Sequence, residues 1–279
     1  MEYSKPYHEK IAVILLNYKS LDLVEQRITE IRRTDPEKQL LYIVVDNGSE
    51  NTHALDEFDK NLPQNAILLR LEKNYGYAAG NNKGIEACRS MQITHMIVMN
   101  PDVTGLTLGK VHQLILAKTG LQNVAVVGPK IQGINPYIAR PGILQLIFPF
   151  FSGTRSHPKS AKPTAVYRVS GSCLLADANI MDSVGGFDER TFLYFEELIL
   201  AEKLRRLGLI TLYCEDVEVR HHASTVINQH IAMKKYKYMY DSLIIYLRHY
   251  RGTSAFSSRL IGLMAITIRV FFNRLRGRK

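Results

Sequence analysis

Four apolar stretches in the first half of the chain each end in amide or carboxylate side chains. The residues at these ends are Asn17, Asp46 with Asn47, Asn74 with Gly76 and Asn82, and Asn100 with Asp102. A carboxylate at a strand end can accept a hydrogen bond from a nucleoside, and a Gly-rich turn before a helix attracts phosphate. Strand ends also carry turn residues for purely structural reasons, which is the competing interpretation at any single position. Four such ends in succession favour a ligand-binding edge.

The segment 99–104, with the sequence MNPDVT, is a candidate metal site. Pro101 restricts the backbone, so Asn100 and Asp102 emerge together at the end of an apolar stretch. Mg²⁺ commonly takes one or two protein ligands and completes its shell with water and substrate phosphates. The structural alternative is that the same residues only cap the following helix.

Two positions later in the chain could act together with these strand ends. Glu196 and Glu197 open an expected helix and diverge by about 100° around its axis, so at most one points squarely into a cleft. Solvated acids that complement the helix dipole are the alternative. In DVEVRHHAST, a two-residue period places His221 on the inward side of a strand with Val217 and Val219. His221 is a candidate ligand or a satisfied core histidine.

The apolar pattern also predicts the elements that must position these residues. Continuous apolar runs, typical of parallel strands covered on both faces, occur at 10–18, 40–47, 66–72, 95–102 and 123–131, and strand character returns at 167–178 and 210–225. Helical spacing lies between them, as in Leu21, Val24, Ile28 and Ile31. This alternation predicts a doubly wound α/β sheet that binds ligands beyond the carboxyl ends of its strands.

The net charge of +10 is concentrated at the C-terminal end. Residues 234–279 hold 11 Lys and Arg against one acid, whereas residues 1–233 hold 25 basic and 25 acidic residues. We therefore predict a neutral domain over residues 1–226 and a helical, basic extension over residues 227–279. Such an asymmetry points to an anionic partner for the extension.

The extension is expected to bind a membrane surface. Only the nine residues Leu260–Ile268 are uncharged between Arg259 and Arg269, whereas a spanning helix needs about 20 apolar residues. A mixed apolar and Arg-rich helix is instead typical of the surface of an anionic membrane. Nucleic acid is the rival partner, because Lys interleaved with Tyr suits phosphates and bases, but it cannot cover the apolar part. A helical pair packed on the catalytic domain is the structural alternative.

Other features bear on the compartment and on access to the site. The three cysteines, Cys88, Cys173 and Cys214, suggest neither a disulfide framework nor a zinc site, and the polar start lacks the apolar stretch of a secretory signal. We expect reduced thiols in the cytosol. The irregular segment Gln132–Pro163 contains the apolar run ILQLIFPFF. It is either core that folds back on the domain or a lid that touches the membrane.

Taken in this order, the motifs resemble those of glycosyltransferase family 2, in the rhamnosyltransferase-like branch of bacterial polysaccharide-assembly enzymes. The resembling segments are VVDNGS, NYGYAAGNNKGI, MNPDV, GSCLLADANIMDSVGGFDE, FLYFEE and HHAST, which together span residues 10 to about 225. The resemblance implies the GT-A fold, with a Rossmann-like, mostly parallel sheet flanked by helices. It also implies a nucleotide-sugar donor, Mg²⁺ or Mn²⁺, and inversion at the anomeric carbon.

The resemblance further implies roles for single residues. Asp46 would contact the nucleoside, and Asp102 the metal-bound diphosphate, with a contribution from His221. The residues assigned to the nucleotide-sugar pocket are Asn17, Asn74, Gly76, Asn82 and Asn100. The family's general base is usually Asp and matches Glu197 here, with Glu196 before it; a downstream acid and Arg of the same helix are replaced by Ile199 and Lys203. The base is therefore Glu197 or Glu196.

These expectations combine into one functional hypothesis. The protein would be an inverting, metal-dependent glycosyltransferase that passes a sugar to a lipid-linked or growing surface-polysaccharide acceptor. The resemblance suggests dTDP-rhamnose as the sugar donor. The enzyme would be peripheral on the cytoplasmic face of the cell membrane. One alternative is a sugar nucleotidyltransferase, which should carry a Gly-rich basic loop where this chain has NYKSLDL. Another is a non-catalytic, membrane-recruited nucleotide-sugar-binding module. The hypothesis requires acids near positions 46, 102 and 197 to meet at one cleft.

Overall fold

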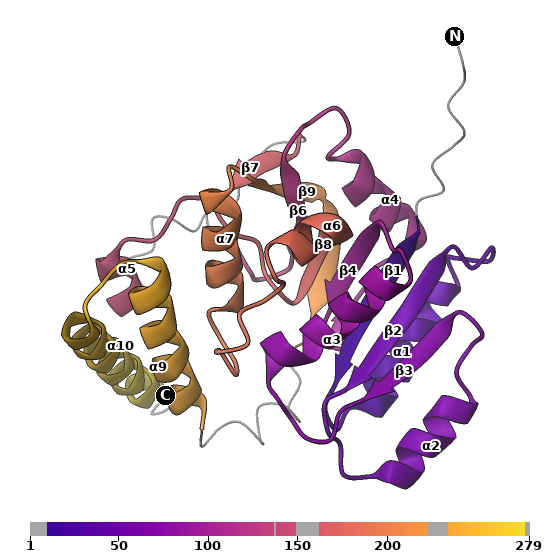
Figure 1. Ribbon diagram of the computed structural model, residues 1–279, viewed down its shortest axis with the longest axis horizontal. Helices are drawn as coiled ribbons and strands as arrows, with labels where there is room; N and C mark the ends of the chain where they lie inside the picture. Colours follow the sequence, from indigo (N-terminus) through magenta and orange to yellow (C-terminus); the bar gives the residue numbers. More distant parts are fainter. Residues whose placement is uncertain (1–9, 137, 149–161, 223–233, 277–279) are drawn as a thin grey trace.

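The computed structural model describes residues 10–136, 138–148, 162–222 and 234–276 (Figure 1). At its centre these residues form a nine-stranded sheet in the order β3-β2-β1-β4-β8-β6-β9-β5, with β7 paired to β9 beside this path. The strands are β1 (Ile11–Asn17), β2 (Leu40–Asp46), β3 (Ala66–Arg70), β4 (His95–Met99), β5 (Val103–Thr104), β6 (Val124–Ile131), β7 (Thr164–Val166), β8 (Cys173–Asp177) and β9 (Ile210–His221).

Most strands of the sheet run in one direction. The pairs β1–β2, β2–β3, β1–β4 and β6–β9 are parallel. Strand β8 is antiparallel to both β4 and β6, so β6 and β9 run with the first four strands. Within the described residues, only β5, β7 and β8 run the opposite way. The predicted α/β fold with a mostly parallel sheet is confirmed.

Helices cover both faces of the sheet. The core on one face includes α1 (Leu21–Arg32) and α4 (Leu108–Leu116), with Phe58 of α2 (Thr52–Lys60) packed against it. The core on the other face includes α3 (Tyr77–Ser90), α6 (Ala178–Ser183) and α7 (Glu196–Arg206). Strand β1 feeds both cores, because Val13 faces one and Ile14 the other. Burial on both faces explains why the central strands are continuously apolar.

The C-terminal helices pack on α7 rather than standing apart from the sheet domain (Figure 1). They are α9 (Lys235–Ile245), the π-helix η2 (Tyr246–Tyr250) and α10 (Ala255–Arg276). A third core joins them to α7 and to α5 (Ile143–Ile147); it includes Leu146, Ile199, Leu243, Tyr246, Leu247 and Ala265. Burial of Ile199 in this core explains why an apolar residue stands there. The boundary predicted at 226/227 lies outside the described residues.

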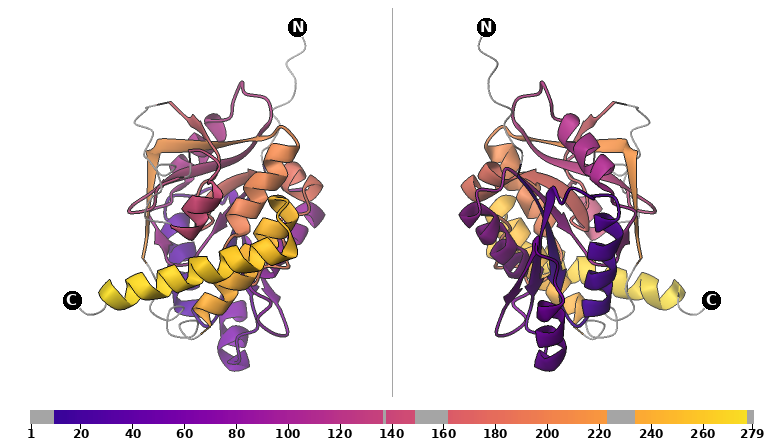
Figure 2. Two further views of the ribbon diagram at one scale, coloured as in Figure 1. Left: turned by 90° about the vertical axis from the view of Figure 1, so that its left-hand side faces the viewer. Right: turned by 90° about the vertical axis from the view of Figure 1, so that its right-hand side faces the viewer.

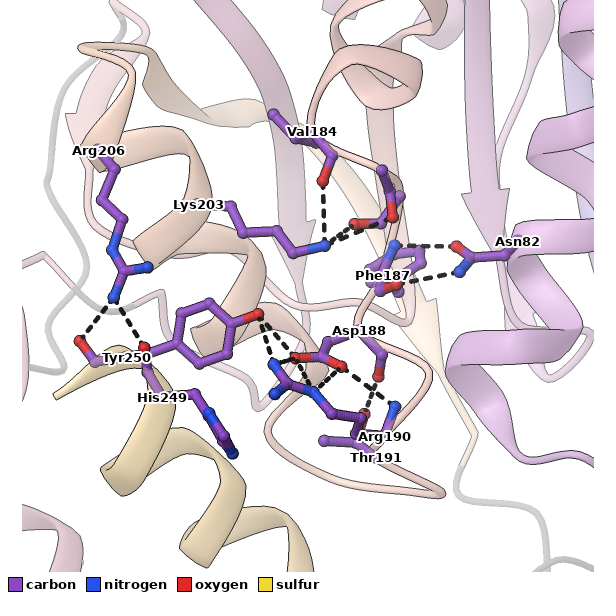
Figure 3. A network of polar contacts seen from close by, with 12 residues as sticks. Asn82, Val184, Phe187, Asp188, Arg190, Thr191, Lys203, Arg206, His249 and Tyr250 are labelled. Carbon is purple, nitrogen blue, oxygen red and sulfur yellow. Dashed lines mark hydrogen bonds and ion pairs between the residues drawn. The ribbon is translucent and has the colours of Figure 1, made fainter. Parts of the chain in front are cut away.

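Polar contacts tie the same helices to the turn before α7 (Figure 3). The Tyr250 hydroxyl donates to Asp188 Oδ2 at 2.7 Å, and Arg190 Nε donates to Asp188 Oδ1 at 2.9 Å. Burial opposes ionisation of Asp188, but these donors outweigh it and lower its pKa to about 2. Lys203 donates to the carbonyl oxygens of Val184 and Gly186, at 3.1 and 2.8 Å, and so holds α7 to the end of α6. Lys203 therefore has a structural role here.

The irregular segment Gln132–Pro163 contributes to the core where it is described. Leu146 and Ile147 of α5 are buried, which agrees with core that folds back on the domain. The stretch 149–161, with most of the apolar run's second half, lies outside the described residues. The three cysteines are buried and form no disulfide.

Helix α10 has an unusual distribution of side chains. Its small residues Ser258, Gly262 and Ala265 face the protein, whereas Phe256, Leu260, Leu263, Met264 and Phe271 are exposed. Figure 2 shows this long helix running across one side of the molecule, with its C-terminal end projecting beyond the sheet. Among the described helices, α10 is long and apolar enough to cross a membrane. The nine uncharged residues Leu260–Ile268 form its central part, between Arg259 and Arg269.

Candidate active site

A cleft of about 440 Å³ gathers residues from distant parts of the chain. Four of the predicted site residues line it: Asn100 after β4, Glu196 and Glu197 at the start of α7, and His221 at the end of β9. Arg168, Ser170, Gly171 and Ser172 before β8 line it too, as do Tyr77 of α3, Gln145 and Leu146 of α5, Met239 of α9 and Arg269 of α10. The cleft therefore lies between the sheet domain and the C-terminal helices.

Asp102 and His221 form a pair at one side of this cleft. Strand β5 pairs antiparallel with β9 so that Val103 lies opposite His221, and the His222 N–H donates to the Asp102 carbonyl at 2.9 Å. His221 Nε2 then lies 3.1 Å from Asp102 Oδ1. The Asp102 side chain is 6% exposed and that of His221 is 21% exposed. His221 lines the cleft, whereas Asp102 is not among its lining residues.

This pair suits a divalent cation that shares its coordination with a substrate. One carboxylate and one imidazole make two ligands, and no cluster of three or more His, Cys, Asp or Glu occurs in the described part of the chain. Mg²⁺ takes few protein ligands and keeps positions for water and phosphate oxygens. The donor set therefore fits a metal that binds together with a diphosphate and does not fit a closed structural site.

Glu197 is held at the wall of the cleft by the backbone of the segment before β8. The Gly171 N–H donates to Glu197 Oε1 at 2.9 Å, and Arg168 Nη1 lies 3.9 Å from the same oxygen. A Cβ at position 171 would lie 2.8 Å from that oxygen, so this close approach requires glycine. The side chain of Glu197 remains 25% exposed. Glu197 is thus both fixed and accessible.

Glu196 has a different environment, although it lies next to Glu197 in the sequence. It is 3% exposed, and its Oε1 is buried with no hydrogen-bond partner. Burial, and then the charge of Glu197, raises the pKa of Glu196 to about 8. The preceding residues Tyr194 and Phe195 have φ values of +74° and +68°, a strained turn of the kind often found at functional sites. At neutral pH Glu196 is mostly protonated, which leaves Glu197 as the better general base.

Asn17 and Asp46 lie at the same edge of the sheet but below its surface. Asn17 Nδ2 donates to Asp46 Oδ1 at 2.6 Å, and the Ser49 N–H donates to Asp46 Oδ2 at 2.9 Å. Both side chains are buried, and neither lines the 440 Å³ cleft. Ser49 lines a neighbouring cavity of about 360 Å³ together with Lys19 and Glu50. Asp46 therefore supports the wall of this second cavity, and its contact with a nucleoside remains a prediction.

Asn74 and Gly76 belong to a tightly bonded turn before α3. Asn74 Oδ1 accepts from the Gly76 N–H at 2.9 Å and from Asn47 Nδ2 at 3.0 Å. Gly76 has a φ of +91°, and a Cβ there would lie 2.4 Å from the Phe192 carbonyl oxygen, so no other residue fits. Asn47 also donates to the Gly76 carbonyl at 3.0 Å. This turn joins the ends of β2 and β3 to the segment before α7.

Asn82 binds the turn before α7 and does not line the cleft. Its side chain accepts from the Phe187 N–H at 2.9 Å and donates to the Phe187 carbonyl at 3.0 Å and to Glu189 Oε1 at 2.9 Å (Figure 3). It is absent from the residues that line the cleft in the described structure. The structure thus gives Asn82 a role in holding the turn before α7, and its contact with the donor stays a prediction.

Comparison with known sequences shows which family the sheet domain resembles. Residues 12–132 match the profile of the family described as "Glycosyl transferase family 2". Over these residues the chain is similar to glycosyltransferase family 2 domains. The resemblance stated above is confirmed, and the comparisons favour a glycosyltransferase over a nucleotidyltransferase or a non-catalytic module.

Two curated relatives of the glycosyltransferase are similar over much of their length. The "N-acetylglucosaminyl-diphospho-decaprenol L-rhamnosyltransferase" of Mycobacterium tuberculosis is 28% identical over 210 residues, which is 67% of this chain and 67% of that protein. The "Low-salt glycan biosynthesis hexosyltransferase Agl10" of Haloferax volcanii is 21% identical over 266 residues, or 93% of this chain and 80% of that protein. Both relatives are named as sugar transferases.

Solved structures show the same fold. The mannosyltransferase PcManGT from Pyrobaculum calidifontis, solved with GDP-Man and Mn²⁺, has a TM-score of 0.61 at 13% identity, over 95% of this chain and 76% of that chain. GalNAc-T7, solved with UDP, GalNAc and Mn²⁺, has a TM-score of 0.60 at 13% identity, over 78% of this chain. The glycosyltransferase spans only 44% of the length of the GalNAc-T7 chain. At these identities the likeness shows the GT-A fold alone.

Sequence reasoning overlooked several residues of the glycosyltransferase that the structure places at the cleft. Gly171 positions Glu197, and Tyr77 donates to the Gly171 carbonyl at 2.6 Å. Arg168 and Arg269 bring positive charge to the cleft walls. The GSC motif was a signal for Gly171, because a glycine between polar residues before a strand indicates a close approach. No local pattern distinguishes Arg269 from the other basic residues of the extension.

Replacing Glu196 by Gln tests the different environments of the two acids. Because the pKa of Glu196 is raised in the fold, the folded state favours its protonated form. Stability is therefore highest below the unfolded pKa of about 4.5 and falls until the pH passes about 8. Glu196→Gln removes this cost, so its thermal unfolding midpoint should exceed that of wild type at pH 9 and approach it at pH 4. If the unfolding midpoints of Glu196→Gln and wild type differed by the same amount at pH 4 and pH 9, the raised pKa of Glu196 would be contradicted.

Proposed function

We propose that the protein is an inverting, metal-dependent glycosyltransferase that passes a sugar from a nucleotide sugar to a hydroxyl of a lipid-linked saccharide. The observation that supports this most is that Glu197 and His221 line one cleft, with the Asp102 carboxylate behind the imidazole at 3.1 Å. An inverting transfer needs a base on the acceptor side and charge stabilisation on the side of the leaving diphosphate. The cleft offers one group of each kind.

Glu197 would act as the general base. In an in-line displacement, the acceptor hydroxyl attacks the anomeric carbon as its proton passes to a carboxylate within hydrogen-bond reach. The bond from Gly171 orients Glu197 by one oxygen, Oε1, so the carboxylate keeps capacity to accept from an acceptor hydroxyl. Glu196, protonated at neutral pH, avoids a second buried negative charge beside the base.

Asp102 and His221 would bind Mg²⁺ or Mn²⁺ together with the donor diphosphate. Such an ion neutralises the negative charge of the leaving nucleoside diphosphate. The burial of Asp102 lowers the local dielectric, which strengthens its attraction for a cation. The solved relatives of this fold that contain UDP or GDP-Man also contain Mn²⁺, which supports the proposed cofactor.

A donor screen tests the proposed function directly. We expect one nucleotide sugar, with dTDP-rhamnose tested first because of the rhamnosyltransferase relative, to raise the thermal unfolding midpoint only when Mg²⁺ or Mn²⁺ is present. The same donor should lose its sugar to a membrane lipid extract, with the product in the inverted anomeric configuration. Consumption of a nucleoside triphosphate with a sugar phosphate would instead identify a nucleotidyltransferase. Binding without transfer or hydrolysis would identify a binding module.

We further propose that the enzyme is peripheral on the cytoplasmic face of the membrane and docks through α10. The exposed apolar residues Phe256, Leu260, Leu263 and Phe271 of α10 are three, four or eight positions apart, so they lie on one side of the helix with Met264 beside them. Arg259, next to this stripe, and Arg274, after it, are exposed and suit anionic headgroups. Small residues on the buried side let α10 pack closely on α9, since Gly262 lies against Tyr240 and Ile244. A helix with its large apolar residues outward suits lipid better than water.

Replacing one residue of the stripe by an acid tests the docking. Leu263 is 58% exposed, so Leu263→Asp should leave the fold intact while it places a charge in the membrane interface. Binding to vesicles that contain phosphatidylglycerol, measured by co-sedimentation, should fall about tenfold or more. Leu116→Asp is a matched control, because Leu116 of α4 is 66% exposed and lies outside α10. Equal binding by both variants would show that the stripe does not dock on lipid.

A further inference from the structure

Arg269 connects the lipid-facing helix to the catalytic cleft. Among the described residues of α10, it alone lines the 440 Å³ cleft. Its guanidinium donates through Nη2 to the Leu146 carbonyl at 2.8 Å and through Nη1 to the Ala265 carbonyl at 3.0 Å. These bonds fix a positive charge at the wall, between α5 and α10. Arg269 follows Ser258, Gly262 and Ala265 at helical spacing, so it lies on the face opposite the exposed apolar stripe.

The position of Arg269 separates it from the two catalytic groups assigned above. Glu197 is held by Gly171 and lies near Arg168, on the segment before β8. Asp102 and His221 are held by the pairing of β5 with β9. Arg269 comes from α10 and lines the cleft together with Gln145 of α5 and Met239 of α9. The helix that carries the apolar stripe on its outer face therefore places a cationic group in the cleft from its inner face.

We propose that Arg269 binds the diphosphate of a lipid-diphosphate-linked acceptor and makes the enzyme specific for that class of acceptor. This proposal rests on the proposed function, since it assigns the acceptor side of the same cleft. A guanidinium offers a rigid fork of N–H donors that matches phosphate oxygens. The face of α10 that carries Arg269 suits an anion inside the cleft, and the exposed apolar face suits a lipid chain outside it. A lipid joined to a diphosphate satisfies both with one molecule.

The geometry also accounts for the order of groups along such an acceptor. The lipid would lie along α10, the diphosphate at Arg269, and the sugar deeper in the cleft with its hydroxyl at Glu197. A cleft of about 440 Å³ is within the usual size of small-molecule sites, roughly 300–1,000 Å³. Arg269 would thus be a specificity-determining residue that acts on acceptor binding and not on the chemical step.

Binding of farnesyl diphosphate measures this site independently of sugar transfer. Titration calorimetry of the full chain in neutral detergent micelles, with EDTA present, should show binding by wild type and little binding of uncharged farnesol. Arg269→Ala should weaken binding of farnesyl diphosphate by about 10- to 100-fold, as expected for loss of a charged hydrogen-bonding partner. Arg269→Lys keeps the charge but loses the fork and should fall between wild type and Arg269→Ala. Thermal unfolding checks that each variant is folded.

Two control variants locate the diphosphate. Arg274→Ala removes an exposed charge from the same helix and should leave the affinity for farnesyl diphosphate unchanged. If Arg274→Ala lost as much affinity as Arg269→Ala, surface charge alone would explain the effect, and the proposal would be overturned. Asp102→Ala should also bind normally in EDTA. In a parallel titration with Mn²⁺ in place of EDTA, a loss in Asp102→Ala without a loss in Arg269→Ala would place the diphosphate at the donor side and overturn the proposal. Absence of binding by wild type overturns the proposal too. None of these results depends on which sugar is transferred, so the proposed function can fail separately.

Discussion

Glu197→Gln is expected to lower kcat for sugar transfer by about 10²- to 10⁴-fold, the usual contribution of a general base. Gln keeps the size of the side chain, and its carbonyl oxygen can still accept from the Gly171 N–H, which is 2.9 Å from Glu197 Oε1 in wild type. Only the ability to take the acceptor's proton is removed. The donor's affinity should therefore change little, and the loss should appear in kcat under saturating donor and acceptor.

Glu196→Gln serves as the matched control for this prediction. The substitution is the same and lies one residue away, yet Glu196 is buried and mostly protonated at neutral pH. We expect its kcat at pH 7 to remain within about tenfold of wild type. If Glu196→Gln abolished transfer while Glu197→Gln retained it, the two acids would exchange roles. If both variants retained full activity, the base would lie elsewhere.

Asp102→Ala is expected to lower kcat/KM by about 10²- to 10³-fold, because it removes the carboxylate proposed to hold the cation for the leaving diphosphate. The variant should also lose affinity for the donor with Mn²⁺, so that the two together no longer raise its thermal unfolding midpoint. His221→Ala should weaken the affinity for Mn²⁺ in the presence of the donor by about 10- to 100-fold. Both measurements use the donor identified by the screen.

A competing explanation for the 3.1 Å contact between Asp102 and His221 is a plain ion pair that only stabilises the fold. In that case both variants would unfold at lower temperature but would still respond to Mn²⁺ with the donor as wild type does. Asp182→Ala provides a control, because Asp182 forms an ion pair with Arg89 at 3.4 Å on the surface, outside the cleft. It removes a carboxylate without touching the cleft, so its metal response should be unchanged.

The fold class and the sheet's central strands could be predicted because their signal is local. Strands β1, β2 and β4 are apolar at nearly every position because each is buried on both faces. The inward position of His221 followed from the period of two along β9, and Val217 and Val219 beside it are indeed buried. Such patterns reflect the surroundings of each residue and need no knowledge of distant parts of the chain.

Tertiary structure decided which of these residues share a site. The pairing of β5 with β9 places Asp102 beside His221, although β5 has only two residues and leaves no recognisable pattern. Asn82 has the same residue type as its neighbours in the Gly-rich loop, yet its contacts lead to Phe187 and Glu189. These contacts follow from the packing of α3 beside α6 and the turn after it.

The C-terminal region shows most clearly what the sequence predicts and what only the tertiary structure determines. Composition alone predicted a basic, partly apolar helix that seeks an anionic surface. Only the packing of α9 and α10 on α7, through the buried side chains of Ile199, Leu243 and Tyr246, turns that helix so that Arg269 enters the cleft while Leu263 stays outside. The periodicity of a helix tells which residues share a face, but the partners on which it packs determine what that face meets.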